Sequence, residues 1–304
     1  MKPTISVLLL SYNHSRYIRS AVLSALKQET TDCKIEVDII DDGSTDGTKE
    51  ILSQLKKDYP NNIRLILSDH GGLQSVSKNF NFLIEKSRGR YLAFLASDDM
   101  YSDNRFNRQL NFLESDPLLV VVYADGVNLY RGELGERLTK GLSHAALKTQ
   151  DPVKCFRVLI TSVSLMWIQS LLIRSDFLKK IKPFDENLIS DDWIFNINVF
   201  RNLVEKKLKF KYIDDIVFYR NIHKENTSGD GRTHFHRVQQ VCDKYIDKSY
   251  TAKILSECAA NFLIISFKYK DAKNFLYFFI KYIRFDISLN FFRNKIIKIL
   301  KGYF

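Results

Sequence analysis

The chain has 304 residues, of which 45% are hydrophobic and 27% charged, and its formal net charge at pH 7 is +11. These totals exclude a mostly disordered protein, and the length suits one large α/β domain with an appendage or two small domains. No run of about 18 uninterrupted apolar residues occurs, so no membrane-spanning helix is expected, and the first apolar run is too short for a signal peptide.

The first part of the chain alternates short apolar runs with segments of helical length. Strands are predicted at residues 4–10, 34–40, 62–68, 90–97 and 118–124, with helices at 15–28, 47–58, 73–87 and 103–115. This alternation indicates right-handed βαβ units and a mostly parallel sheet with helices on both faces. Ligands of such sheets bind beyond the carboxyl ends of the strands. The residues that follow each strand are therefore the first candidates for a site.

Polar residues follow three of the predicted strands. They are Ser11-Tyr12-Asn13 after the first strand, Asp41-Asp42-Gly43-Ser44 after the second and Asp98-Asp99 after the fourth. Because parallel strands end at a common edge of the sheet, these three groups are expected to converge on one rim.

The second half of the sequence is less regular. It predicts a helix around 151–161, a helix opened by Asp191 and Asp192, a strand near 208–213 and a loop over 218–231. From about residue 232 it indicates helices in which aromatic residues interleave with Lys and Arg. Residues 229–304 carry 14 Lys and Arg against 6 Asp and Glu, which is +8 of the net charge. Any anionic partner should therefore be sought there first.

The cysteines are scattered along the chain and show no CxxC spacing. This pattern is typical of reduced thiols that fill a core, and it argues against a disulfide framework or a zinc site. The four residues are Cys33, Cys155, Cys242 and Cys258.

Pairs of neighbouring aspartates are the most informative feature. For Asp41 and Asp42 a structural interpretation is as good as a functional one, since short polar residues favour turns at strand exits. Asp98 and Asp99 end what should be a buried central strand, where each carboxylate raises the pKa of the other unless a cation stabilises both charges. A divalent metal ion with oxygen ligands would do so, although two solvated loop aspartates are the alternative.

The third pair, Asp191 and Asp192, precedes Trp193 and an apolar helix. Taken alone, it is best explained as an N-cap followed by an acidic residue in the first turn. Together with a metal-binding pair elsewhere in the chain, it would also supply the general base of a metal-assisted group transfer.

Four blocks of sequence, in this order, resemble one family. They are "ISVLLLSYNHSRYIRSAVLSALKQ", "VDIIDDGSTDGTKEIL", "SVSKNFNFLIEKSRGRYLAFLASDDM" and "IKPFDENLISDDWIF". The chain resembles the inverting nucleotide-sugar glycosyltransferases of family 2 over roughly residues 4–225. The resemblance implies an α/β fold of the GT-A type, which is a Rossmann-like, mostly parallel mixed sheet flanked by helices. The helices indicated from about residue 232 add a C-terminal helical extension to this fold.

The resemblance also implies a nucleotide site. Tyr12 matches the residue that packs on the base, and Asp42 matches the carboxylate that accepts a hydrogen bond from it, with Asp41 as its neighbour. Lys78 and Asn79 stand where the family often has "RN", near the ribose or diphosphate.

The chemistry is likewise assigned by resemblance. Asp99 matches the direct ligand of Mg²⁺ or Mn²⁺, and Asp98 lies nearer the ribose and is a second candidate ligand. His223 resembles a polar loop that closes over the diphosphate and is a third candidate ligand, although a plain loop histidine explains it equally well. Asp192 matches the catalytic base of an "ED" pair in which this chain has Asp191 in place of Glu.

Two positions depart from the family pattern. Leu10 replaces the usual Pro at the end of the first strand, and Ser97 replaces a frequent Asp before the metal-binding pair. Neither change removes one of the carboxylates, so they put details of donor binding in doubt and leave the expected activity intact.

These observations predict a metal-dependent inverting glycosyltransferase, with residues 1–228 as the catalytic domain and 229–304 as a basic helical extension. The resemblance implies a nucleotide-sugar donor, with UDP favoured over dTDP and GDP. It also implies that the acceptor is a hydroxyl of a surface glycan or of a polyprenyl-linked precursor, as in capsule or O-antigen synthesis. The C-terminal helices have three interpretations: a basic cap packed on the catalytic domain, a helix that binds a partner, or an interfacial membrane anchor. The third is favoured, so a cytoplasmic enzyme bound peripherally to the anionic inner face of the membrane is expected.

Two other functions compete with this prediction. An inactive family member could serve as a scaffold in a polysaccharide assembly complex, but all three acidic pairs are retained. A nucleic-acid-binding role would suit the basic tail, but that tail has more Phe and Ile than such segments usually have. No nucleic-acid partner is therefore expected.

Overall fold

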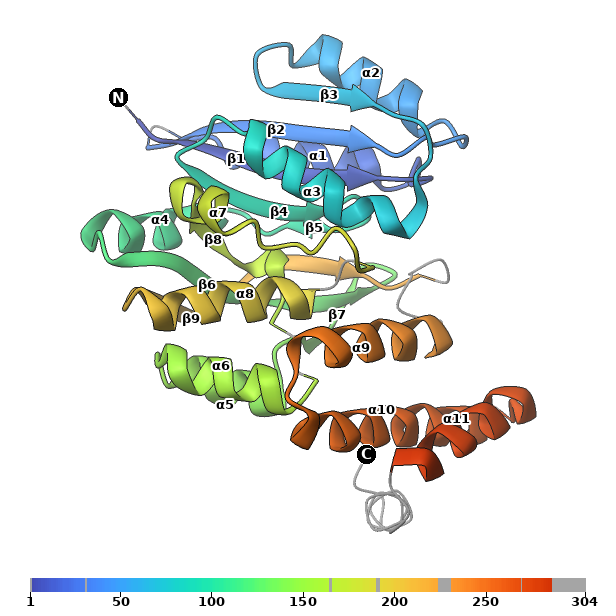
Figure 1. The fold of residues 1–304 in the computed structure, drawn as a ribbon. Helices are drawn as coiled ribbons and strands as arrows, with labels where there is room; N and C mark the ends of the chain where they lie inside the picture. The colour runs from blue at the N-terminus through green and yellow to red at the C-terminus, as the bar shows by residue number, and fades with distance from the viewer. Residues whose placement is uncertain are drawn as a thin grey trace. The chain divides into compact units, whose positions relative to one another are not determined.

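A computed structural model describes residues 2–30, 32–163, 166–189, 192–223, 231–268 and 270–285. The chain divides into two compact units (Figure 1). We call residues 1–158 with 164–223 the sheet unit, and residues 159–163 with 224–304 the helical unit. The predicted domain boundary between residues 228 and 229 lies outside the described residues.

The described part of the sheet unit contains one mixed sheet of nine strands. They are β1 (Thr4–Ser11), β2 (Lys34–Asp41), β3 (Ile63–Leu67), β4 (Tyr91–Ala96), β5 (Met100–Tyr101), β6 (Leu119–Tyr130), β7 (Glu133–Arg137), β8 (Leu172–Arg174) and β9 (Lys209–Asn221). Their order is β3-β2-β1-β4-β8-β6-β9-β5, and β7 pairs with β6. Strands β1 to β4 are mutually parallel, whereas β8 is antiparallel to both β4 and β6.

Helices and short 3₁₀ turns connect the strands of the sheet unit. They are α1 (Ile18–Leu26), α2 (Thr48–Asp58), η1 (Gly72–Gln74), α3 (Ser75–Lys86), α4 (Arg105–Ser115), α5 (Gly141–Lys148), α6 (Pro152–Thr161), η2 (Ile168–Ser170), α7 (Ser175–Ile181) and α8 (Asp192–Glu205). The last residues of α6 belong to the helical unit. The predicted alternation of strands and helices over residues 4–124 is therefore confirmed.

The core of the sheet unit lies around its central strands. Ile5, Val7 and Leu9 of β1 are fully buried, and so are Ala21 and Val22 of α1. Both faces of β1 are covered, because Leu8, on the opposite face, is buried as well. This double burial explains why the sequence of β1 is mainly apolar, without a regular alternation of apolar and polar residues.

Strand β9 differs from its prediction. It extends to Asn221, so the interpretation of residues 218–221 as part of a loop is wrong. Pairing with β6 along residues 218–221, and with the short β5 at Phe218 and Tyr219, satisfies the backbone of these residues although Arg220 and Asn221 are polar. Residues 224–230 of the predicted loop lie outside the described residues.

The helical unit is built from α9 (Gly231–Tyr245), α10 (Lys248–Lys268) and α11 (Ala272–Phe285). Its core contains Phe235 of α9, Leu255 and Leu263 of α10, and Phe278 and Tyr282 of α11, all almost fully buried. The helical prediction from about residue 232 is confirmed as far as residue 285. None of the helices within the described ranges is long and apolar enough to cross a membrane.

All four cysteines are buried free thiols. Burial raises the pKa of Cys155, Cys242 and Cys258 to about 12, so these thiols stay protonated at neutral pH. The core-filling interpretation of the cysteines is confirmed.

Candidate active site

The carboxyl ends of β1, β2 and β4 lie level with one another. In the sheet register Ser11 is opposite Asp41, and Leu10 is opposite Ala96. The polar residues that follow these strands therefore start from one rim of the sheet, as the sequence predicts.

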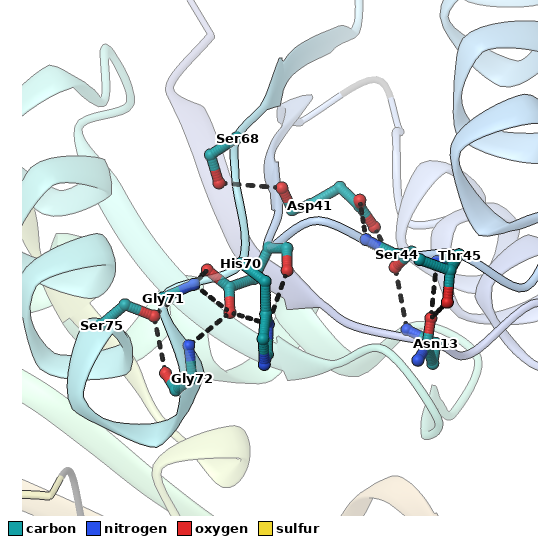
Figure 2. Close-up of polar contacts among 10 residues, drawn as sticks. Asn13, Asp41, Ser44, Thr45, Ser68, His70, Gly71, Gly72 and Ser75 are labelled. Carbon is teal, nitrogen blue, oxygen red and sulfur yellow. Dashed lines mark hydrogen bonds and ion pairs between the residues drawn. The ribbon is translucent and has the colours of Figure 1, made fainter.

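Asp41 and Asp42 face different surroundings. Asp41 is fully buried, and its carboxylate accepts hydrogen bonds from the backbone N–H of Ser44 at 2.9 Å and from the Ser44 hydroxyl at 2.6 Å. The structural interpretation therefore accounts for Asp41, which stabilises the turn after β2 (Figure 2).

The Asp42 carboxylate contacts the segment from Ser68 to Ser75. It accepts hydrogen bonds from the N–H groups of Gly71 and Gly72 at 3.1 and 3.2 Å and from the Ser75 hydroxyl at 3.2 Å. His70 Nδ1 lies 3.0 Å from its Oδ2 atom. The Tyr12 ring, which is 41% exposed, stacks on the His70 ring with 4.0 Å between centroids and 15° between planes.

Asn13 joins the exits of β1 and β2. Its backbone N–H donates to the Ser44 hydroxyl at 2.8 Å, and its side-chain oxygen accepts from the N–H of Thr45 at 2.8 Å (Figure 2). Asn13 has a φ of +52°, a conformation that Asn adopts more readily than most residues. The local sequence thus fixes Tyr12 beside the turn that carries Asp42.

Asp98 and Asp99 form the turn after β4. The buried Asp99 carboxylate accepts hydrogen bonds from the N–H of Asn221 at 2.8 Å and from the Gln169 amide at 2.9 Å. Burial, followed by the neighbouring charge of Asp98, raises the pKa of Asp99 to about 7. Asp98 Oδ2 lies 2.9 Å from Nε2 of His223, the predicted third ligand.

Asp192 begins α8, as the sequence predicts. Its Oδ2 atom accepts a hydrogen bond from the N–H of Ile168 at 3.3 Å. Ile168 is the neighbour of Gln169, which contacts Asp99, so one turn, η2, contacts both carboxylates. Asp191, the predicted partner of Asp192, lies outside the described residues.

Lys78 and Asn79 lie near the start of α3. This helix begins at Ser75, whose hydroxyl contacts Asp42, so the two residues follow the Asp42 contact by one turn. Lys78 is exposed and Asn79 half-buried. Their assignment to the ribose or diphosphate stays a prediction.

The fit of a metal ion rests on the two aspartates after β4. No group of three or more His, Cys, Asp or Glu side chains within the described ranges is already arranged to hold a metal. Mg²⁺ is usually bound by one or two carboxylates together with substrate phosphates and water, and not by a cage of protein ligands alone. Asp98 and Asp99 suit that kind of site, and a divalent cation would offset the repulsion and burial that raise the pKa of Asp99.

Several residues of this rim have no sequence signal of their own. Gln169 and the Arg105 side chain that supports it lie in mixed or apolar stretches, and His70 lies in a glycine-containing loop. The buried Arg105 guanidinium donates to the carbonyl oxygens of Gln169 and Leu171 at 2.6 and 2.7 Å. Only the tertiary contacts reveal these residues.

Residues 6–166 match the model of the family described as "Glycosyl transferase family 2". The chain belongs to glycosyl transferase family 2. The resemblance seen in the sequence is therefore confirmed.

One curated relative in this family is the minor teichoic acid biosynthesis protein GgaA of Bacillus subtilis. It is 27% identical over 284 residues, which cover 91% of this chain and 58% of that protein. The chain thus spans less than two thirds of the length of GgaA.

Solved structures share the fold of this family 2 chain. Staphylococcus aureus TarS 1-349 in complex with UDP-GlcNAc has a TM-score of 0.61 at 19% identity, over 94% of this chain and 79% of that one. The mannosyltransferase PcManGT of Pyrobaculum calidifontis, in complex with GDP-Man and Mn²⁺, has a TM-score of 0.56 at 14% identity, over 80% of this chain and 64% of that one. The predicted fold, a GT-A-like sheet flanked by helices with C-terminal helices, is confirmed.

Proposed function

We propose that this family 2 chain is a metal-dependent inverting glycosyltransferase that moves a sugar from a nucleoside diphosphate to an acceptor hydroxyl. The observation that supports it most is that Asp99 and Asp192, far apart in the sequence, contact neighbouring residues of the η2 turn. A metal-binding carboxylate next to a general base is the pair that such a transfer requires.

The donor site is assigned to the rim beside these carboxylates. Tyr12 would stack on the base, Asp42 would accept a hydrogen bond from it, and Lys78 and Asn79 would lie toward the ribose or diphosphate. UDP is the favoured carrier because TarS 1-349, which shares the fold, is described in complex with UDP-GlcNAc. A surface glycan or its polyprenyl-linked precursor is the favoured acceptor because GgaA is named as a teichoic acid biosynthesis protein.

Each carboxylate has one part in the reaction. When the bond between the anomeric carbon and the diphosphate breaks, negative charge develops on the phosphate oxygens. Mg²⁺ or Mn²⁺ would supply Lewis-acid stabilisation of that charge, and Asp99 and Asp98 would hold the ion. Gln169 and the backbone of Asn221 orient Asp99 for this role.

The acceptor is activated from the other side of the sugar. The Asp192 carboxylate takes the proton of the acceptor hydroxyl while the oxygen of that hydroxyl forms the new bond to the anomeric carbon. Attack opposite to the departing diphosphate inverts the configuration at that carbon. The N–H of Ile168 donates a hydrogen bond to one oxygen of this carboxylate and helps to orient it.

A thermal-shift screen tests the donor assignment. We expect UDP with Mn²⁺ to raise the melting temperature more than dTDP, GDP or ADP does, and UDP without metal to raise it little. A ligand at 100 times its Kd stabilises the folded state by about 2.7 kcal/mol, which a melting curve resolves. If no nucleoside diphosphate stabilises the protein with either metal, and no nucleotide sugar is hydrolysed or transferred, the inactive-scaffold alternative is favoured.

We also propose that the helical unit binds an anionic membrane surface, which would place the enzyme peripherally on the inner face of the cell membrane. On α11 the exposed residues Leu276, Phe279, Ile280 and Ile283 recur at the spacing of one helix face. We call these four residues the α11 outer face. Lys273 and Arg284 of the same helix are exposed and flank the α11 outer face. An apolar face flanked by cationic side chains is typical of a helix that lies at the headgroup boundary of a membrane.

Vesicle binding tests this surface. We expect sedimentation with phosphatidylglycerol-containing vesicles and little with pure phosphatidylcholine. The double change Leu276→Ser and Ile280→Ser should weaken binding by about tenfold or more, since each buried apolar side chain contributes about 1.5–3 kcal/mol. The control Leu134→Ser removes an equally exposed leucine from β7 and should leave binding unchanged. Binding to oligonucleotides without vesicle binding would instead favour a nucleic-acid partner.

A further inference from the structure

The segment from Ser68 to Ser75 covers the position assigned to the nucleobase. His70 stacks on the Tyr12 ring with their centroids 4.0 Å apart and their planes within 15°. Stacked aromatic rings already lie about this close, so no third ring fits between them. The His70 ring thus covers this face of the Tyr12 ring and leaves no room there for a nucleobase.

The Asp42 carboxylate is also occupied. Its acceptor positions, about four for a carboxylate, face the N–H groups of Gly71 and Gly72, the Ser75 hydroxyl and His70 Nδ1. His70 Nδ1 also lies 3.0 Å from the Asp42 carbonyl oxygen. Since both partners of Nδ1 are acceptors, this nitrogen carries a proton.

Glycines allow this close approach. Gly43, in the turn after Asp42, has a φ of +78°, and a Cβ atom there would lie 2.6 Å from the backbone nitrogen of His70. A Cβ atom at Gly71 would lie 2.6 Å from that of Ser75. A side chain at either position would collide with its neighbour. Glycine at both positions therefore allows the β2 exit to contact the segment from Ser68 to Ser75 (Figure 2).

We propose that His70 is a specificity-determining residue that occupies the nucleobase position until the donor displaces it. An aromatic ring on Tyr12 with an N–H group directed at Asp42 reproduces the two contacts assigned to the base. A base must therefore stack and hydrogen-bond better than His70 to bind. This inference rests on the proposed function, because it takes Tyr12 and Asp42 as the base site.

Occupation by His70 lowers the apparent affinity for the donor. The measured Kd equals the intrinsic Kd divided by the fraction of molecules whose site is open. If His70 covers the site in about nine of ten molecules, its removal tightens donor binding about tenfold. A residue that only contacts the base would have the opposite effect.

Calorimetric titration of the whole chain with UDP at saturating Mn²⁺ tests the proposal. We expect His70→Ala to lower the Kd for UDP by about tenfold, while His70→Phe, which keeps a stacking ring without the N–H group, has a smaller effect. Leu73 is an exposed residue of the same segment, so Leu73→Ala is the matched control and should leave the Kd for UDP unchanged. Tyr12→Ala should weaken binding.

Hydrogen exchange adds a second readout. The N–H groups of Gly71 and Gly72, which donate to Asp42, should exchange faster when UDP binds the wild-type protein. If UDP binds but His70→Ala has an equal or higher Kd, or both N–H groups stay protected, the inference about His70 is overturned and the proposed function stands. If neither form binds any nucleoside diphosphate, the proposed function fails and the inference fails with it.

Discussion

Replacing Asp192 with Asn is expected to lower kcat by about 10²- to 10⁴-fold, the usual loss for a general base. An amide cannot take the proton of the acceptor hydroxyl, but its oxygen can still accept the hydrogen bond from the N–H of Ile168. The fold and the donor site should therefore be retained, and the Kd for UDP should stay within about twofold because Asp192 is assigned no contact with the donor.

Single-turnover kinetics and UDP titration on the same samples separate the two effects. Asp176→Asn is a suitable control, since Asp176 is another acidic residue in the first turn of a helix and is exposed. It should leave kcat unchanged. Full activity of the Asp192→Asn enzyme would show that Asp192 is not the general base.

Replacing Asp99 with Asn is expected to abolish stabilisation by UDP with Mn²⁺ and to lower kcat by about 10³-fold or more. A metal ion contributes several kcal/mol to a charged transition state, and each 1.36 kcal/mol is a factor of about ten. Burial disfavours the ionised form of Asp99, so a neutral side chain removes that penalty, but both carboxylate oxygens accept hydrogen bonds, from the N–H of Asn221 and from the Gln169 amide. The NH₂ group of the new Asn would face one of these donors, so the metal-free variant should still fold but melt at a lower temperature than the wild-type protein.

Manganese binding measured by electron paramagnetic resonance distinguishes a ligand from a merely structural residue. The Asp99→Asn protein should lose the metal bound in the presence of UDP, whereas the Asp176→Asn control should keep it. Unchanged Mn²⁺ affinity would show that Asp99 is not a ligand, even if activity fell.

Much of the parallel half of the sheet could be predicted from sequence. Strands β1 and β4 are buried on both faces, so they appear as mainly apolar runs between helical segments, with Ser6 as the polar residue inside β1. β5 and β8 have only two and three residues, which is too short for a recognisable pattern. The polar end of β9 resembles a loop because its strand character comes from pairing with β6, which no local signal reports.

The candidate site could be predicted only in part. The carboxylates of Asp42, Asp98 and Asp99 follow strand ends, where parallel topology brings residues together, whereas Asp192 begins the helix α8. The different surroundings of Asp41 and Asp42 were not predictable, because turn chemistry and base recognition favour the same residue type. Gln169 and His70 were missed because their contacts depend on tertiary structure, and polar residues in mixed segments carry no periodic signal.

The η2 turn has a mechanical consequence. Its N–H at Ile168 holds Asp192, its neighbour Gln169 holds Asp99, and the buried Arg105 anchors the carbonyl oxygens of Gln169 and Leu171. If Asp192 and Asp99 have the roles proposed above, a single short peptide would hold both the general base and the metal ligand. The spacing between these two groups would then be set mainly by this peptide and by its anchor, Arg105.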